Sequence, residues 1–243
     1  MKYWINLLVA SLISTQVLAD ASPEAGWNGD LEVGMHLTSG SESSQLWLGE
    51  IDIYHQAAGR SDRLQLDGRY QQKRDREDHA KTVSSARYKF SLKSEFADTP
   101  QDDYRFILIR NRYNRFAYYQ NMPSFVAGIG QYFKPTESSE LALEIGPGIR
   151  WNRRSHGVID REALLHIAEE LEWKLTEQTS LVQEASIEAG RRVGVSQLEV
   201  SIRNALSKML ALKVGVTNTR ENKLPDTETE SETETRVTLV YSF

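Results

Sequence analysis

Apolar and polar residues alternate along most of this chain. At the C-terminal end, Thr235, Val237, Leu239, Tyr241 and Phe243 fall on one face, and the other face is mainly polar. A period of two residues is the pattern of a β-strand with two unlike faces. The pattern recurs in residues 27–37, 63–70, 85–92, 140–151 and 210–216. It predicts an all-β chain of about twelve strands.

Two stretches are ambiguous between strand and helix. Residues 160–176 and 197–214 are rich in helix formers and have apolar residues at helical spacing, yet their residues also divide into two strand faces. Local propensity favours a helix in both. We nevertheless predict strands, because a barrel with an unpaired edge in lipid would leave backbone groups without hydrogen bonds.

Polar, turn-rich segments separate the predicted strands. They are residues 38–43, 57–62, 71–79, 97–102, 135–139, 153–158 and 219–232. The acidic run DTETESETE at 226–234 is predicted to form a mobile loop before the last strand. Pro147 lacks an amide hydrogen and is predicted to mark a bulge or a strand end.

The N-terminus has the features of an export signal. Lys2 precedes a mostly apolar stretch, and small residues surround Ala19, which predicts cleavage after that residue. We therefore expect a signal peptide at 1–19 and one β-barrel domain at 20–243. The apolar stretch is too short and too interrupted for a membrane-spanning helix.

Composition narrows the classes further. The formal net charge is −5, and loss of Lys2 with the signal peptide would make it −6. With no basic stripe, no nucleic-acid partner is expected. The absence of cysteine excludes disulfides, thiol nucleophiles and a lipid-modified N-terminal cysteine.

These features together predict an antiparallel transmembrane β-barrel in the outer membrane of a Gram-negative cell. We expect the first strand, near 27–37, to pair with the last, near 233–243. A final strand ending in Tyr241 and Phe243 is typical of the signal that the barrel assembly machinery recognises. The expected partners are therefore that machinery during biogenesis, outer-membrane lipid, and small ions if the lumen conducts.

Several short motifs occur in a recognisable order. They are LTSG at 37–40, GIGQYF at 128–133, LEIGPGIR at 143–150, LVQE at 181–184 and LVYSF at 239–243. In this respect the chain resembles the putative salt-induced outer membrane protein family, a family without an assigned activity, over nearly its whole mature length. Ser41 and Glu42 stand where the family usually has Asn-Thr. The resemblance implies an outer-membrane barrel and no catalytic residue.

No motif indicates catalysis or a cofactor. The glycine pairs at 128/130 and 146/148 lack the spacing of a phosphate-binding loop, and bending or close packing of strands explains them better. The five histidines show no metal-ligand spacing. Ser155-His156 and Ser84-Ser85 do not by themselves indicate a hydrolase, although a triad assembled in space stays open.

Charge on the polar faces is the main candidate chemistry. If those faces point inward, they line the lumen with charged residues: Glu144, Arg150, Glu162, Glu170, Glu172, Glu184 and Glu188. Arg69, Arg87 and Lys89 would join them. Such a lining either stabilises a narrow barrel by ion pairs or selects ions by sign.

A second basic stretch lies among aromatic residues. Arg105, Arg110, Arg112 and Arg115 lie near tyrosines and phenylalanines that could form an interface girdle, where the arginines could bind lipid phosphate. Ordinary charges at a strand end explain the stretch equally well.

We expect a non-enzymatic membrane protein: a narrow channel, or a structural envelope component linked to stress. The stress link comes from the family name alone. The alternatives are an outer-membrane lipid-modifying hydrolase and a soluble periplasmic lipocalin-like binder. The last would require apolar faces that point inward.

Overall fold

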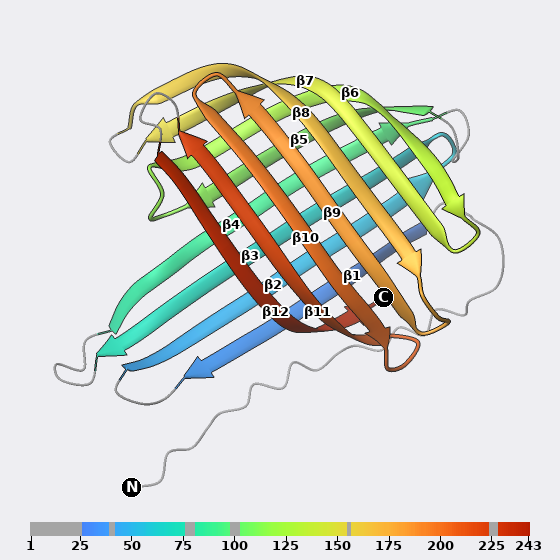
Figure 1. The fold of residues 1–243 in the computed structure, drawn as a ribbon, viewed down its shortest axis with the longest axis horizontal. Coiled ribbons are helices and arrows are strands. Elements are labelled where there is room, and N and C mark those ends of the chain that lie inside the picture. The colour runs from blue at the N-terminus through green and yellow to red at the C-terminus, as the bar shows by residue number, and fades with distance from the viewer. Residues whose placement is uncertain (1–25, 39–41, 76–80, 98–102, 155–156, 224–227) are drawn as a thin grey trace, which may run out of the picture.

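The protein is a closed antiparallel barrel of twelve strands (Figure 1). The computed structural model describes residues 26–38, 42–75, 81–97, 103–154, 157–223 and 228–243. The strands are β1 (Gly26–Thr38), β2 (Glu42–Ala57), β3 (Arg60–Asp75), β4 (Lys81–Phe96), β5 (Asp103–Asn114), β6 (Tyr119–Thr136), β7 (Ser139–Arg154), β8 (Ile159–Lys174), β9 (Thr179–Gly190), β10 (Val193–Ala205), β11 (Leu210–Lys223) and β12 (Glu228–Ser242).

Each strand pairs with its neighbours in sequence, and β1 pairs with β12 to close the barrel. This confirms the predicted fold class, strand number and closing pair. We call the end that holds Gly26 and Phe243 the terminal end; it lies on the right in Figure 1. The other is the far end. The predicted signal peptide lies outside the described residues.

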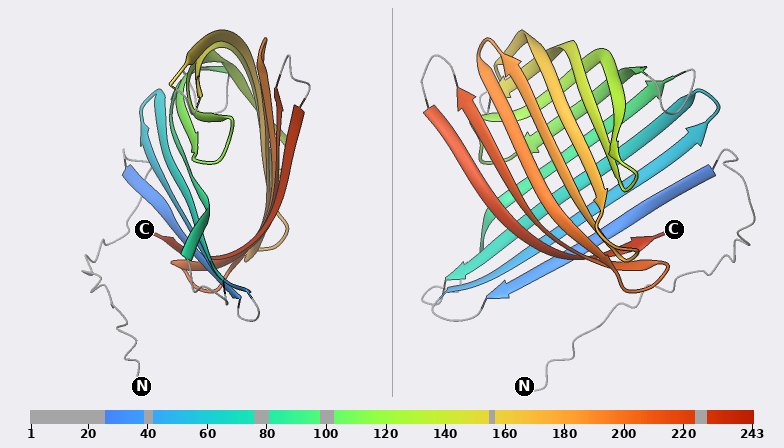
Figure 2. Two further views of the ribbon diagram at one scale, coloured as in Figure 1. Left: turned by 90° about the vertical axis from the view of Figure 1, so that its left-hand side faces the viewer. Right: turned by 45° about the vertical axis from the view of Figure 1, so that its right-hand side comes forward.

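The β1–β12 seam is short. Asp30–Val33 pair with Leu239–Ser242, and Gly29 and Phe243 exchange two backbone hydrogen bonds of 3.0 Å. Every other pair of neighbouring strands is joined over a longer register, for example from Gly26 to Thr38 between β1 and β2. Beyond the seam the two strands diverge toward the far end (Figure 2).

The two ambiguous stretches are strands, as predicted. The first lies in β8, which pairs in regular register with β7 and β9. The second covers most of β10, a tight turn and the start of β11. Sheet partners on both sides supply the hydrogen bonds that would otherwise form within a helix, so tertiary pairing overrides local propensity.

Three local predictions are wrong. The acidic run is not a loop, because Glu228–Ser242 forms β12; residues 226–227 lie outside the described part. The 71–79 turn begins too early, since β3 continues to Asp75. Pro147 lies inside β7 opposite Leu165 with no register shift there, so it marks neither a bulge nor a strand end.

The outer face of the barrel is largely apolar. Ile107, Ile145, Ile167, Val214 and Leu239 are examples of large side chains that point outward and are exposed. A lipocalin-like binder would require the opposite orientation. In the described residues, no helix is long and apolar enough to cross a membrane.

Glu169 is a polar exception on this outer face. It lies on the outward side of β8 between Ile167 and Leu171, and its carboxylate accepts a 3.0 Å hydrogen bond from the side-chain amide of Gln183.

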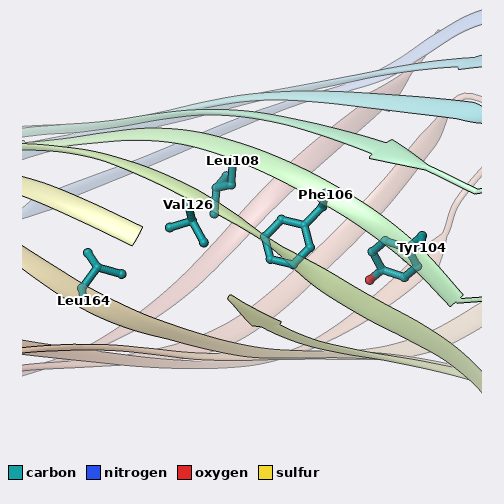
Figure 3. Packing of buried hydrophobic residues seen from close by; sticks show 5 residues of the cluster. All are labelled: Tyr104, Phe106, Leu108, Val126 and Leu164. Carbon is teal, nitrogen blue, oxygen red and sulfur yellow. The ribbon is translucent and has the colours of Figure 1, made fainter. Parts of the chain in front are cut away.

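Part of the lumen is filled by apolar side chains. Tyr104, Phe106 and Leu108 project inward from β5 and pack with Val126 of β6 and Leu164 of β8 (Figure 3). Because both faces of this part of β5 are apolar, the strand shows no clear alternation in sequence. A second buried apolar cluster, formed by Tyr119, Met122, Val193 and Val195, lies toward the far end. Charged side chains elsewhere in the lumen form the candidate site.

Candidate functional site: a charged lumen

Ion pairs cross the lumen from one wall to the other. Seen toward one end, β1–β4 form one wall and β9–β12 the opposite wall, with β5–β8 joining them (Figure 2). Inward-facing basic residues of β3, β4 and β5 reach carboxylates on β7, β8, β9 and β12. These contacts bring together residues far apart in sequence and make the lumen narrow.

Arg63 forms the central crossing. Its guanidinium binds Asp52 of the neighbouring strand β2 at 2.7 Å. The same group reaches across to Glu170 of β8 at 3.0 Å and Glu184 of β9 at 3.4 Å. Tyr54 packs against it, with the guanidinium carbon 5.0 Å from the ring centroid. One cation therefore holds three carboxylates at the middle of the lumen.

A second crossing lies beside the apolar cluster. Lys93 of β4 binds Glu144 of β7 at 2.7 Å and Glu95 of its own strand at 2.8 Å. Glu144 also accepts a 2.8 Å hydrogen bond from the Tyr104 hydroxyl, and Nε2 of the buried His166 lies 3.8 Å from its second oxygen. The Glu144 carboxylate is thus held by three different strands.

Glu188 is the centre of an arginine cluster near the far end. Arg110 and Arg112 of β5 bind its two oxygens at 2.7 and 3.0 Å. Arg150, whose side chain is fully buried, lies 3.3 Å from Glu188 and 2.8 Å from Glu162. Burial of these charges is possible because each cation faces a carboxylate.

Glycine makes room for the buried Arg150. A Cβ atom on Gly190 would lie 2.6 Å from the Glu162 carboxylate and 2.8 Å from a guanidinium nitrogen of Arg150. Asn152 also donates a 2.5 Å hydrogen bond to Glu162. Only a residue without a side chain fits beside this ion pair.

At the far end the crossing runs between β12 and the β3–β4 hairpin. Arg69 binds Glu234 at 2.6 Å and Glu232 at 3.0 Å, and Arg87 binds the same two carboxylates. Arg236 of β12 reaches Asp67 of β3 at 3.0 Å. The acidic run in β12 therefore has basic partners on the opposite wall.

Four neighbouring cavities run along the lumen. From the terminal end to the far end we call them the terminal, inner, central and outer cavities, and they hold about 350, 170, 80 and 120 Å³ of water-accessible space. A buried water needs roughly 10–15 Å³ on this measure, so even the central cavity has room for several.

Adjacent cavities share walls. The terminal and inner cavities share Ser61, Glu95, Tyr132 and Glu140. The inner and central cavities share Arg63, Lys93, Ala142 and Glu170. The central and outer cavities share Gln65, Lys89, Glu184 and Gln197. Arg63 and its partner Glu170 thus lie on the wall shared by the inner and central cavities.

Carboxylates outnumber cations in the outer and inner cavities, whereas the terminal and central cavities are lined by equal numbers of acidic and basic residues. The outer cavity is lined by six acidic residues, Glu50, Asp67, Glu184, Glu199, Glu232 and Glu234, and by four basic residues, Arg87, Lys89, Arg112 and Arg236. The inner cavity has four acidic residues, Glu95, Glu140, Glu170 and Glu172, and two basic residues, Arg63 and Lys93.

All seven residues that the sequence suggested as a lumenal lining project into the barrel, but they do not form one group. Glu144, Glu170 and Glu184 line the central cavity, and Glu170 and Glu172 line the inner cavity. Arg150, Glu162 and Glu188 are buried in the far-end cluster. A role of these residues in selectivity remains a prediction.

Sequence reasoning named Arg69, Arg87 and Arg150 as lumenal but missed Arg63 and Lys93, two cations that cross the lumen. Arg63 shares the polar face of its strand with Arg69, so its inward direction was readable, whereas its partners more than a hundred residues away were not. The proposed contact of Arg110 and Arg112 with lipid phosphate is wrong, because both point inward to Glu188. Arg105 and Arg115 are exposed.

Tyr241 and Phe243 lie at the β1–β12 seam. Tyr241 pairs with Leu31 of β1 and with Leu210 of β11, and its ring stacks on Phe243 at 6.3 Å between centroids. Their recognition by the assembly machinery stays a prediction.

Solved structures share this architecture at low sequence identity. The NanC porin matches with a TM-score of 0.53 and 6% identity, over 88% of this chain and 98% of that one. The COG4313 outer membrane channel from Pseudomonas putida F1 matches with a TM-score of 0.52 and 10% identity, over 92% and 97%. The translocator domain of the autotransporter NalP from Neisseria meningitidis matches with a TM-score of 0.50 and 10% identity, over 89% and 87%.

At these identities the likeness establishes a common barrel fold. No curated protein matches the chain. The sequence does match, over residues 31–243, the family described as "Protein of unknown function, DUF481". That match covers most of the chain and agrees with the resemblance seen in its motifs, so the chain belongs to the DUF481 family.

Proposed function

We propose that this protein is an outer-membrane β-barrel that acts as a narrow, cation-preferring channel. The observation that carries the proposal is the row of four lumenal cavities with shared walls, which taken together are lined by twelve acidic and nine basic residues. Fixed charge of one sign along a narrow path favours ions of the other sign. The apolar outer face and the closed hydrogen-bonding of the barrel support placement in a membrane.

Arg63 lies on the wall that the inner and central cavities share. A permeating cation passes the three carboxylates that Arg63 holds, and an anion meets their repulsion there. Since the guanidinium also repels cations, conduction is expected to be small. The same charges thus account for a preference in sign and for a low rate.

The test is single-channel recording from the folded, detergent-purified protein in a planar bilayer under a salt gradient. We expect small, reproducible steps with a reversal potential on the cation-selective side, and their loss when the barrel is unfolded by heat. Anion preference would contradict the role given to the carboxylates.

A structural envelope barrel is the second candidate. The cross-lumen ion pairs of Arg63, Lys93 and Arg110 favour it, because they tie opposite walls together. A barrel that is folded by its gel mobility but electrically silent would support this candidate and overturn the channel. A link to salt stress belongs to the same proposal and rests on the family resemblance.

A further inference from the structure

Arginines cluster around one part of the far end of the barrel. Within the described residues, the ends of β5 to β10 hold six of them around one part of the rim: Arg115, Arg153, Arg154, Arg161, Arg191 and Arg192. We call this group the arginine rim. On the opposite wall, the same end of β11 and β12 carries Arg220 together with Glu221, Glu230 and Glu232. The arginine rim is therefore more positive than the same end of β11 and β12, where both signs of charge occur.

Contacts along the rim hold it together as one surface. Arg154 binds Asp160 at 2.8 Å, and Arg192 of the β9–β10 turn binds the same carboxylate at 2.7 Å. The Arg154 guanidinium also lies 5.3 Å from the ring centroid of Tyr118 in the β5–β6 turn. These contacts connect the tips of three successive hairpins.

The other four arginines of the rim are exposed and have no carboxylate partner within the described residues. Asp160 is the acidic group of this surface and is already shared by two arginines. Glu162 points inward, where it binds Arg150 and the backbone amide of Arg192. Several guanidinium groups are therefore available to an external anion.

The rim lies where an apolar surface ends. Arg153 and Arg161 are on the outward faces of β7 and β8, and Arg161 stacks over Trp151 at 5.9 Å. Ile159, the cross-strand partner of Arg153, is 58% exposed, and Phe116 beside Arg115 is 55% exposed. Aromatic residues with arginine at the border of an apolar band mark the membrane interface.

A ligand for this surface needs anionic oxygens close to hydrocarbon chains. Phosphate suits a guanidinium in particular, because the two form parallel, charge-assisted hydrogen bonds. A small soluble anion would make no apolar contact with the exposed Ile159 and Phe116, whereas the acyl chains of a lipid would.

We infer that the arginine rim is a binding site for a phosphorylated membrane lipid, with the phosphate on the arginines and the acyl chains along β6 to β8. The inference rests on the membrane placement proposed above and is independent of whether the lumen conducts.

The test is native mass spectrometry of the folded full-length barrel in detergent. The probes are bisphosphorylated lipid A and the same lipid after enzymatic removal of its phosphates. We expect the phosphorylated form to bind at least tenfold more tightly. Equal binding of the two forms would overturn the proposal and leave the membrane placement untouched, because heat-dependent gel mobility reports folding separately.

Variants assign the effect to the rim. We expect Arg153→Gln with Arg161→Gln to remove most of the preference for the phosphorylated form. The matched control is Arg105→Gln with Arg220→Gln, two outward-facing arginines elsewhere on the barrel, which should keep that preference. An equal loss in both double variants would show attraction by net charge alone and refute a built site.

Two further readouts complete the test. If the first double variant does not fold, Arg191→Gln in the β9–β10 turn replaces it, with a smaller loss of preference expected. Inorganic phosphate at millimolar concentration should leave lipid binding nearly unchanged. Full displacement by inorganic phosphate would identify a site for the free anion and refute the lipid.

Discussion

Replacing Arg63 with alanine is expected to change both the size and the sign preference of the conduction path. The substitution removes a guanidinium group from the wall between the inner and central cavities. It also leaves Asp52, Glu170 and Glu184 without the cation that neutralises them. We therefore expect larger conductance steps and a stronger preference for cations.

The charge effect can be estimated from Coulomb's law. Loss of one positive charge about 5 Å from a monovalent ion changes its energy by about 0.8 kcal/mol at the dielectric constant of water, and by about 3 kcal/mol at an effective value near 20. A cation gains this energy and an anion loses it. Even the smaller figure shifts the cation-to-anion ratio by roughly tenfold.

The assay is the reversal potential of Arg63→Ala in a planar bilayer under a salt gradient, beside the unmodified protein. Arg203→Ala is the matched control: Arg203 also faces inward and binds Asp30 at 2.8 Å, but it lines none of the four cavities. Arg63→Lys keeps the charge and should keep the original selectivity. Unchanged conductance and selectivity in a folded Arg63→Ala barrel would refute the reasoning.

Other predictions concern the outer face, the strand packing and the far-end charges. Gln183→Leu removes the hydrogen bond to the outward-facing Glu169 and should lower the free energy of unfolding by about 1–3 kcal/mol. The measurement is the urea midpoint for unfolding from vesicles, and an unchanged midpoint would contradict this prediction. Gly128→Ala would place a Cβ atom 2.3 Å from a backbone oxygen of β7 and should lower the free energy of unfolding by about 1–3 kcal/mol in the same assay. In the control Gly194→Ala the new Cβ atom meets no atom within 4 Å, so the urea midpoint should not change. Glu232→Gln should reduce cation preference at roughly 0.1 M salt and have little effect at roughly 1 M, since the screening length falls from about 10 to about 3 Å; a loss independent of salt would count against an electrostatic role.

Much of the barrel was predictable because one physical pattern repeats. Lipid on one side and a polar lumen on the other impose alternation, so β11, with Leu212, Val214 and Val216 outward, was predicted correctly. The pattern failed on β5, where Tyr104 and Phe106 fill the lumen and make both faces apolar. Arg110 and Arg112 were misplaced for this reason.

The interior contacts were beyond the reach of sequence alone. The acidic run in β12 resembles a solvated loop because every second residue of it is a glutamate. The basic residues that pair with these carboxylates are on β3 and β4, far away in the sequence. The alternation of apolar and polar residues predicts which side chains face inward. It does not predict which of these side chains contact one another, because that depends on how the two walls approach each other.

The short β1–β12 ladder has a consequence for how the molecule forms and comes apart. Its two strands are the first and last of the barrel, so closing this ladder joins residues farther apart in sequence than any other strand pair and carries the greatest loss of chain entropy. The short ladder forms few backbone hydrogen bonds to offset that loss of entropy. The ladder is therefore expected to be the last to form during assembly. The amide hydrogen of Phe243, which is donated to Gly29 of β1, should exchange with solvent before the amide hydrogens at the centre of the β6–β7 ladder.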